Sequence, residues 1–181
     1  MARLGPDDGN PDEEWADRST DRAKSAWLRT LEDMRAMARD REESGYEALT
    51  LQAGNTAPMA PDQGETDRWG LIYTVPGEDA EPFGDLVDRA SFEETAVYQA
   101  SIGRETFLVT EALDHDAEIA CFIAGSYLRT AAPALVRAAI DRGRMYSHVK
   151  TLDGTQYGTI EHDDPAAFFP DPESIYAYEV S

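Results

Sequence analysis

The stretch from Phe92 to Gly143 constrains the fold more than any other part of the chain. Apolar side chains recur at every second position in three runs, and short polar breaks separate these runs. The runs are Thr95–Ile102, Thr106–Leu113 and Ile119–Ala124, and the breaks are Gly103-Arg104 and Asp114-His115-Asp116. This pattern predicts antiparallel hairpins. After Gly125 the apolar period changes to about 3.6 residues, which predicts a helix that ends at Gly143.

A long apolar stripe at helical spacing lies in the N-terminal third. Its members are separated by three or four residues, and they are Ala23, Trp27, Leu31, Met34 and Ala38. The stripe predicts an amphipathic helix of about five turns that ends at Gly45. We interpret it as a surface that packs on the sheet, and a helix–helix interface is the alternative.

The remaining segments predict shorter elements. The expected strands are Tyr46–Leu51, Trp69–Val75, Met145–Thr151 and Thr155–Glu161, the last two joined by a turn at Asp153-Gly154. A short helix is expected over Phe83–Ala90, and residues Ala53–Arg68 read as one long loop. Asp164 and Pro165 are the N-cap and first residue of a single turn that ends at Phe168-Phe169. The alternation of Tyr176, Tyr178 and Val180 suggests an edge strand.

These elements predict an α+β fold. We expect one antiparallel sheet of about six or seven strands, with the long N-terminal helix and a second helix packed on one face. Tight turns between strands leave no room for the crossovers that parallel strands need. Residues 1–18 are expected to form an acidic, mobile arm, 19–170 a single domain, and 171–181 a tail. One shared core is expected from Val97, Phe107, Val109, Ile119, Cys121, Ile123, Leu135, Val136, Ala139 and Ile140 with Trp27, Leu31 and Met34.

The charge balance is unusual. The chain has 36 acidic and 16 basic residues, a net charge of −20, and only two lysines, Lys24 and Lys150. Such a surface is favoured at molar salt, where the Debye length of about 3 Å screens the repulsion between carboxylates. The same charge disfavours nucleic-acid binding through a broad basic surface. With one cysteine, Cys121, and no membrane-length apolar run, we expect a cytoplasmic protein without disulfides.

Two segments place histidine among carboxylates, and these are the candidates for chemistry. His115 and Asp116 lie in one, and His162 and Asp163 lie in the other. If the two segments met in space, they could bind a divalent metal. Both lie at predicted turns or strand ends, where Asp is favoured for local hydrogen bonds. We therefore favour a structural role, expect no cofactor, and expect replacement of His162 by alanine to change stability little.

Two other clusters have competing interpretations. Tyr146, His148 and Lys150 share one face of a predicted strand and could bind a small anion, but we favour the solvent-exposed face of a hairpin. Arg137, Arg142 and Arg144 surround a helix C-terminus, where the helix dipole favours cations. A local nucleic-acid contact by these arginines is the alternative.

Several short motifs carry a family resemblance. They are Arg68-Trp69-Gly70-Leu71, the segment Tyr127–Gly143, His162-Asp163-Asp164-Pro165 and Phe168-Phe169. In these motifs the stretch from Arg22 to Phe169 resembles an uncharacterised family of small acidic haloarchaeal proteins. The resemblance implies adaptation to high salt and implies no activity and no catalytic residues.

Three functions of different classes fit these observations. We expect a halophile-adapted binding, regulatory or interaction protein, because no nucleophile with a plausible base and no cofactor loop is found. The alternative is a small metal-dependent enzyme, hydrolase-like, that uses His115/Asp116 and His162/Asp163. A nucleic-acid-associated factor is the third. The partner is not specified by the sequence, and both a protein partner and a homo-oligomer remain open.

Overall fold

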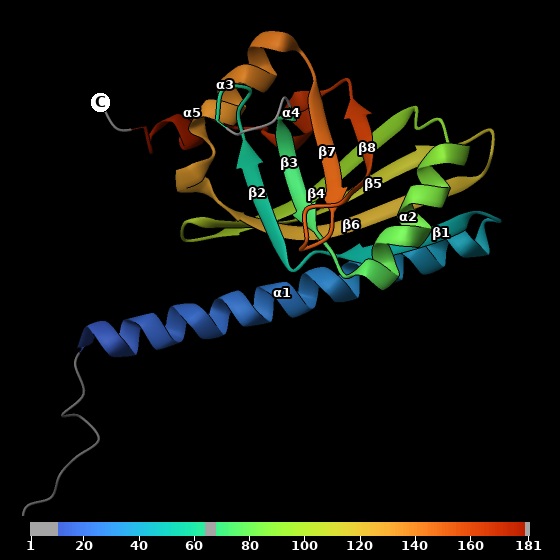
Figure 1. Ribbon diagram of the computed structural model, residues 1–181. Helices are drawn as coiled ribbons and strands as arrows, with labels where there is room; N and C mark the ends of the chain where they lie inside the picture. The colour runs from blue at the N-terminus through green and yellow to red at the C-terminus, as the bar shows by residue number, and fades with distance from the viewer. Residues whose placement is uncertain (1–10, 64–67, 180–181) are drawn as a thin grey trace, which may run out of the picture.

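The computed structural model describes residues 11–63 and 68–179, with side chains from residue 20 onward. Its elements are α1 (Pro11–Glu43), β1 (Glu47–Gln52), β2 (Asn55–Met59), β3 (Gly70–Thr74), α2 (Gly77–Arg89), β4 (Glu94–Ile102), β5 (Glu105–Asp114), β6 (Ile119–Leu128), η2 (Arg129–Ala131), α3 (Pro133–Arg142), β7 (Met145–Lys150), β8 (Gln156–His162), α4 (Pro165–Phe168) and α5 (Pro172–Tyr176). Two layers of strands lie against each other, and α1 runs along the outside of one layer (Figure 1).

The strands form two sheets, and this corrects the expectation of a single antiparallel sheet. The first sheet has the order β1-β6-β5-β4, and the second sheet has the order β2-β3-β7-β8. The hairpins β4–β5, β5–β6 and β7–β8 are antiparallel as predicted. However, β1 pairs with β6 in parallel, and β3 pairs with β7 in parallel. The strands of each parallel pair are far apart in the sequence. The chain that connects them includes strands of the other sheet, and this long connection provides the crossover that parallel pairing needs.

The segment expected to be one long loop contains β2. This strand pairs only with β3, at the edge of the second sheet. Pro58 is its fourth residue, and proline is tolerated in a strand whose N–H side faces no partner. The proline and the lack of periodicity hid the strand from sequence reasoning. Residues 64–67 lie outside the described residues.

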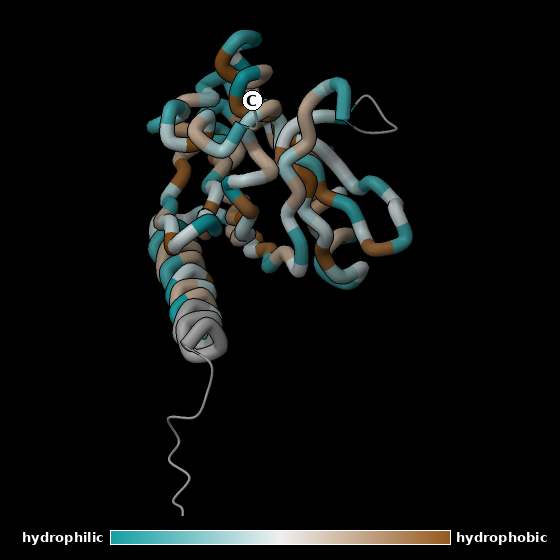
Figure 2. Tube along the Cα trace, turned by 90° about the vertical axis from the view of Figure 1, so that its left-hand side faces the viewer, coloured by the Kyte–Doolittle hydropathy of each residue, from teal (hydrophilic) through white to brown (hydrophobic). Residues whose placement is uncertain are grey.

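The core is divided into two, because the first sheet is apolar on both faces. Its inner face packs on the second sheet, with Leu108, Cys121 and Ile123 against Tyr73 and Val149. Its outer face packs on α1, with Val109, Leu113, Ala120, Phe122 and Ala124 against Leu31, Met34 and Ala38. The expected single core therefore does not exist as such. Figure 2 looks along α1, which lies to one side of the two sheets.

Two glycines permit this arrangement. Gly125 lies on β6 where the sheets approach closely, and a Cβ there would lie 2.4 Å from the Thr56 hydroxyl and 2.8 Å from the Tyr73 ring. Gly143 ends α3 in the left-handed conformation, with φ 67°, as the sequence predicted. Cys121 is buried and unpaired, also as predicted.

The ends of the chain differ from expectation. Helix α1 begins at Pro11, before the expected start at residue 19, and the mobility expected of residues 1–10 lies outside the described residues. The tail forms α5 where an edge strand was expected. Its Asp171-Pro172 start repeats the Asp164-Pro165 pattern, a signal that the tyrosine alternation obscured. None of the described helices is long and apolar enough to cross a membrane.

Candidate functional site

His115 lies at the exposed end of the β5–β6 hairpin, between two partners. Its Nδ1 is 2.7 Å from the Tyr46 hydroxyl, and its Nε2 is 2.5 Å from a carboxylate oxygen of Glu94. Asp116 beside it is exposed. Asp114 accepts hydrogen bonds from the backbone N–H groups of Ser91 and Ala117, and the first of these bonds lowers the pKa of its carboxyl most. The aspartate therefore fixes the turn.

His162 lies in the opposite environment, sealed between the sheets. Its Nδ1 is 2.7 Å from the Thr95 hydroxyl and its Nε2 is 2.8 Å from the Ser147 hydroxyl. The ring also packs on Phe168, with the ring centres 4.7 Å apart. Burial lowers the pKa of His162 to about 3, so the ring is neutral and joins two hydroxyl groups. Ser147 is fully buried, so this serine–histidine pair cannot reach a substrate.

The two predicted metal segments do not meet. Glu94, which contacts His115, pairs with Leu113 on the α1 side of the first sheet, and its neighbour Thr95, which contacts His162, points to the inner side. The sheet therefore separates the two rings. Asp163 is exposed. Among the residues described, no group of three or more histidine, cysteine or acidic side chains is arranged to hold a metal ion.

His148 was expected on a solvent-exposed face, and the structure shows that this was wrong. Its side chain is buried, with Nε2 2.8 Å from the backbone carbonyl of Trp69 and Nδ1 2.8 Å from the Thr159 hydroxyl. Because a carbonyl only accepts, Nε2 carries the proton and Nδ1 accepts from Thr159. Desolvation lowers the pKa of His148. His148 is therefore not available to bind an anion together with Tyr146 and Lys150.

Each of the three clustered arginines contacts a group of this chain. Arg137 pairs with Glu179 and lies 4.0 Å from the centre of the Tyr176 ring. Arg142 lies 5.2 Å from the Trp69 ring, and Arg144 donates to the Tyr146 hydroxyl at 3.4 Å. These contacts join α3 to its neighbours and account for the cluster without a nucleic acid.

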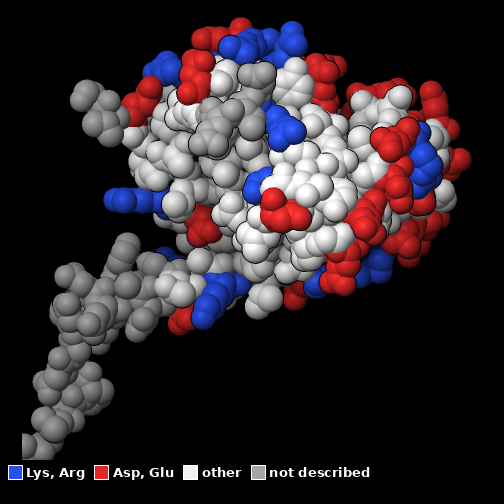
Figure 3. All heavy atoms as spheres, viewed as in Figure 1, with Lys and Arg blue, Asp and Glu red and all other residues white. Residues whose placement is uncertain are grey.

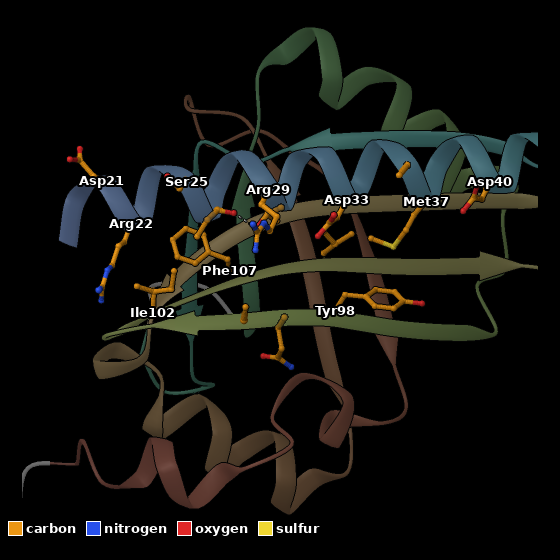
Figure 4. Close-up of a pocket in the computed structure, with 16 residues that line it drawn as sticks. Asp21, Arg22, Ser25, Arg29, Asp33, Met37, Asp40, Tyr98, Ile102 and Phe107 are labelled. Atoms are coloured by element: carbon orange, nitrogen blue, oxygen red, sulfur yellow. Dashed lines mark hydrogen bonds between the residues drawn. The ribbon is translucent and has the colours of Figure 1, made fainter. Parts of the chain in front are cut away.

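A groove beside α1 is a feature that sequence reasoning missed. It is lined by α1 between Asp21 and Asp40, by β4 between Tyr98 and Ile102 and by two residues of β5, and its volume is about 830 Å³. The apolar floor consists of Tyr98, Ala100, Ile102, Phe107 and Val109. Figure 4 shows the labelled side chains of α1 and of the two strands on either side of this space. We call it the β4 groove.

The β4 groove exists because α1 covers only part of the first sheet. The residues of α1 that pack on the sheet, Leu31 and Met34, contact β5 and β6 residues such as Val109 and Phe122. Strand β4 lies beyond them at the sheet edge, and Tyr98 on its outer face is 51% exposed. The sequence signal was present, because Ala96, Tyr98, Ala100 and Ile102 form an apolar set at alternate positions. Only the register of α1 on the sheet shows that this set stays uncovered.

The wall of the groove is charged. Asp21, Asp33 and Asp40 contribute carboxylates, and Arg22 and Arg29 contribute guanidinium groups. A second groove of about 1000 Å³ lies near Lys24 and Trp27 of α1, beside the loop Gln52–Asn55. Figure 3 shows acidic side chains gathered over the region of α2.

Comparisons with known proteins give one match. No curated protein and no solved structure is significantly similar to the chain. The profile of a family of unknown function (DUF7529) matches residues 13–170, which include α1 from its first turn, both sheets and the turn opened by Asp164. The chain therefore belongs to the DUF7529 family of unknown function.

Proposed function

We propose that this protein is a non-enzymatic interaction domain whose β4 groove binds a helical segment of a partner protein. The observation that carries the proposal is the uncovered apolar floor beside α1. The α1 residues that line the groove run from Asp21 to Asp40, a length of about 30 Å at 1.5 Å per residue. A compact small molecule would fill only part of such a long, open space, whereas an amphipathic helix of about five turns matches its length.

The charge of the chain indicates the chemistry of the partner. With a net charge of −20, the protein attracts cations at long range, and three aspartates line the groove itself. A partner helix with an apolar stripe and flanking lysine or arginine residues complements both floor and wall. Arg22 and Arg29 of the wall can donate hydrogen bonds to acidic residues of that helix. The metal-dependent alternative has no comparable support, because the sheet separates His115 from His162.

A pair of designed peptides tests the proposal. Both carry leucines at helical spacing, and one has lysine and arginine on its polar face while the other has glutamate. The basic peptide is expected to bind in calorimetry and the acidic peptide to bind at least about tenfold more weakly, a difference of about 1.4 kcal/mol. Equal binding of both, or no binding of the basic peptide at about 1 mM, contradicts the proposal.

Two matched variants locate the binding surface. Asp33→Trp places an indole in the β4 groove, whereas Glu32→Trp makes the same change of charge and a similar change of size at an exposed position that lines neither groove. Binding of the basic peptide should weaken at least about tenfold in the first variant and change little in the second. Equal effects of the two variants would place the binding surface elsewhere.

We further infer that the protein is adapted to molar salt inside a cell, as haloarchaeal proteins are. Acidic residues outnumber basic ones by 36 to 16, lysine is nearly absent, and the only cysteine is a buried thiol. At high salt the repulsion between carboxylates is screened, and contacts with apolar surfaces such as the groove floor become more favourable.

A further inference from the structure

We propose that the protein forms a symmetric dimer in which β4 pairs antiparallel with β4 of a second copy, so that the two first sheets become one continuous sheet. This inference does not rest on the proposed function, because the pairing uses the backbone edge of β4, whereas the groove uses side chains on its outer face; the two surfaces share Tyr98. The strand that occupies the edge is β4 of a second copy of this chain.

The edge of β4 lacks the protection that the other edges have. Among the described strands, the edges of the two sheets are β1, β2, β8 and β4. Strand β2 contains Pro58, the β7–β8 pairing has a bulge, and β1 is a six-residue strand whose first residue, Glu47, pairs with Arg89. Helices α1 and α4 contact β4 through its side chains, but β4 has none of these features at its edge. Strand β4 has nine residues, more than the other three, and its pairing with β5 is regular. The unpaired N–H and C=O groups of an unprotected edge of this length are a template for pairing with another strand.

The exposure of β4 agrees with an unoccupied edge. No residue of β4 is buried, whereas all but the first residue of its neighbour β5 are buried. From Thr95 to Ile102 the strand contains no charged residue, no lysine and no proline. Natural edge strands use such residues to prevent association. Their absence here favours a partner strand over solvent.

The hairpin register determines which backbone groups are available. Ile102 pairs with Glu105 across the two-residue turn Gly103-Arg104, so they form the hydrogen-bonded pair that closes the hairpin. Even-numbered residues of β4 then bond to β5, and odd-numbered residues direct their N–H and C=O groups to the open edge. The outward residues are Thr95, Val97, Gln99 and Ser101.

This set of outward residues is symmetric about Tyr98. Pairing two copies about Tyr98 places Val97 opposite Gln99 of the second copy and Thr95 opposite Ser101. Every outward residue then has a bonded partner in the other copy. No other register of two β4 strands pairs all four residues from each strand. The geometry of a single chain thus selects one dimer.

Side chains support the same register. Tyr98 of each copy meets at the axis, where a non-hydrogen-bonded pair brings side chains close and favours aromatic contact. At each end, the acidic start of one strand, Glu93 and Glu94, comes beside Arg104 in the turn of the second copy. Two such pairs form by symmetry. They offset locally the repulsion between two chains that each carry a net charge of −20.

A cysteine at the axis tests the register. The native Cys121 is fully buried and burial raises the pKa of its thiol to about 12, so it does not compete. In Tyr98→Cys the two introduced thiols face each other across the axis at a Cα separation of about 4.5 Å, within the range for a disulfide. Diamide, which accepts the two electrons and two protons, should convert this variant to a covalent dimer within minutes.

The matched control is Leu152→Cys, because Leu152 is 90% exposed and lies in the β7–β8 turn, away from β4. It should stay mainly monomeric under the same oxidation. Equal rates for the two variants would contradict pairing at Tyr98. In sedimentation at high salt, the wild type should show twice the mass of one 20.0 kDa chain. A monomer at every concentration would overturn the dimer.

A backbone variant gives a second test. Val97→Pro removes an outward N–H without removing a bond to β5, and Val97→Thr keeps the N–H with nearly the same shape. The proline variant should dissociate at least about tenfold more readily than the threonine variant. If the proline variant does not fold, the cysteine test still decides. If the dissociated Val97→Pro variant still binds the basic peptide, peptide binding in the groove does not require the dimer. If Asp33→Trp loses the dimer, the groove and the dimer interface are not independent.

Discussion

At the scale of single residues, the three histidines show how little a local sequence says about environment. His115 and His162 are both followed by aspartate, yet one is exposed between Tyr46 and Glu94 and the other is sealed between the sheets. The expectation that His162→Ala would change stability little is not supported by this burial. Its removal would leave the hydroxyls of Thr95 and Ser147 without their partner, which we expect to cost about 1–3 kcal/mol.

The burial of His162 makes stability depend on pH. Its pKa is about 3 in the folded state, against an ordinary value of 6.5 for the unfolded chain. Between these values the unfolded chain binds more protons, so stability falls as the pH falls. The loss from pH 7 to pH 5 should be about 2 kcal/mol. Urea unfolding of wild type and His162→Gln at both pH values measures it, since other groups contribute equally to the two proteins. An unchanged pH dependence in the variant would show that His162 is protonated without penalty.

The cap of α4 gives a prediction with an adjacent control. Asp164 accepts a hydrogen bond from the N–H of Ala166 at 3.1 Å, as the Asp-Pro pattern predicted, and Phe168 and Phe169 are buried behind it. Asp164→Ala should lower the free energy of unfolding by about 0.5–2 kcal/mol. Asp163→Ala removes the same charge from an exposed neighbour and should have little effect. Denaturant titration of the two variants is the measurement, and equal losses would show that charge and not capping matters.

At the scale of elements, α3 shows where a periodic pattern identifies a helix but misplaces part of its surface. Leu135, Val136 and Ala139 are buried as expected, whereas Ile140 is 39% exposed and its place in the predicted core was wrong. Position 140 follows Ala139 by about 100°, beyond the width of the stripe that contacts the strands. A 3.6-residue pattern predicts which residues lie at the centre of a buried helix face more accurately than which residues lie at its margins.

This difference predicts unequal effects of two similar truncations in α3. Leu135 is fully buried, so Leu135→Ala should lower the free energy of unfolding by about 2–5 kcal/mol through lost packing and a residual cavity. Ile140→Ala removes a comparable side chain from the exposed margin and should cost less than about 1 kcal/mol. Urea unfolding compares them directly. A larger loss for Ile140→Ala would mean that the helix is rotated relative to the sheets.

At the scale of the whole molecule, we expect the net charge to affect stability more than any single ion pair. Few cations are available to offset the 36 carboxylates, and ion pairs such as Arg89–Glu47 and Arg137–Glu179 are exposed on the surface. Surface pairs of this kind contribute little. The uncompensated repulsion opposes the compact state at low salt and is screened at high salt.

Thermal unfolding should therefore depend on salt. The melting temperature is expected to rise steadily between about 0.1 M and about 3 M KCl, because the Debye length falls to about 3 Å over this range. Circular dichroism at each concentration gives the curve, and a repeat in sucrose separates screening from the general stabilisation of compact states. A melting temperature that is flat or falls with KCl would contradict adaptation to high salt.

The sequence by itself determined the local elements. Its alternation predicted the hairpins β4–β5–β6 and β7–β8, its apolar stripe predicted α1, and Asp164-Pro165 predicted α4, because each depends on residues within a few positions of one another. The tertiary structure decided how distant elements meet. The parallel pairs β1–β6 and β3–β7, the division into two sheets and the burial of His148 depend on strands far apart in the chain. The β4 groove likewise depends on distant elements, since α1 packs mainly on β1, β5 and β6 and leaves part of the outer face of β4 uncovered. The edge of β4 is open because β4 is the last strand of its sheet. A period identifies which residues share a face, and only the assembled fold shows which faces remain uncovered.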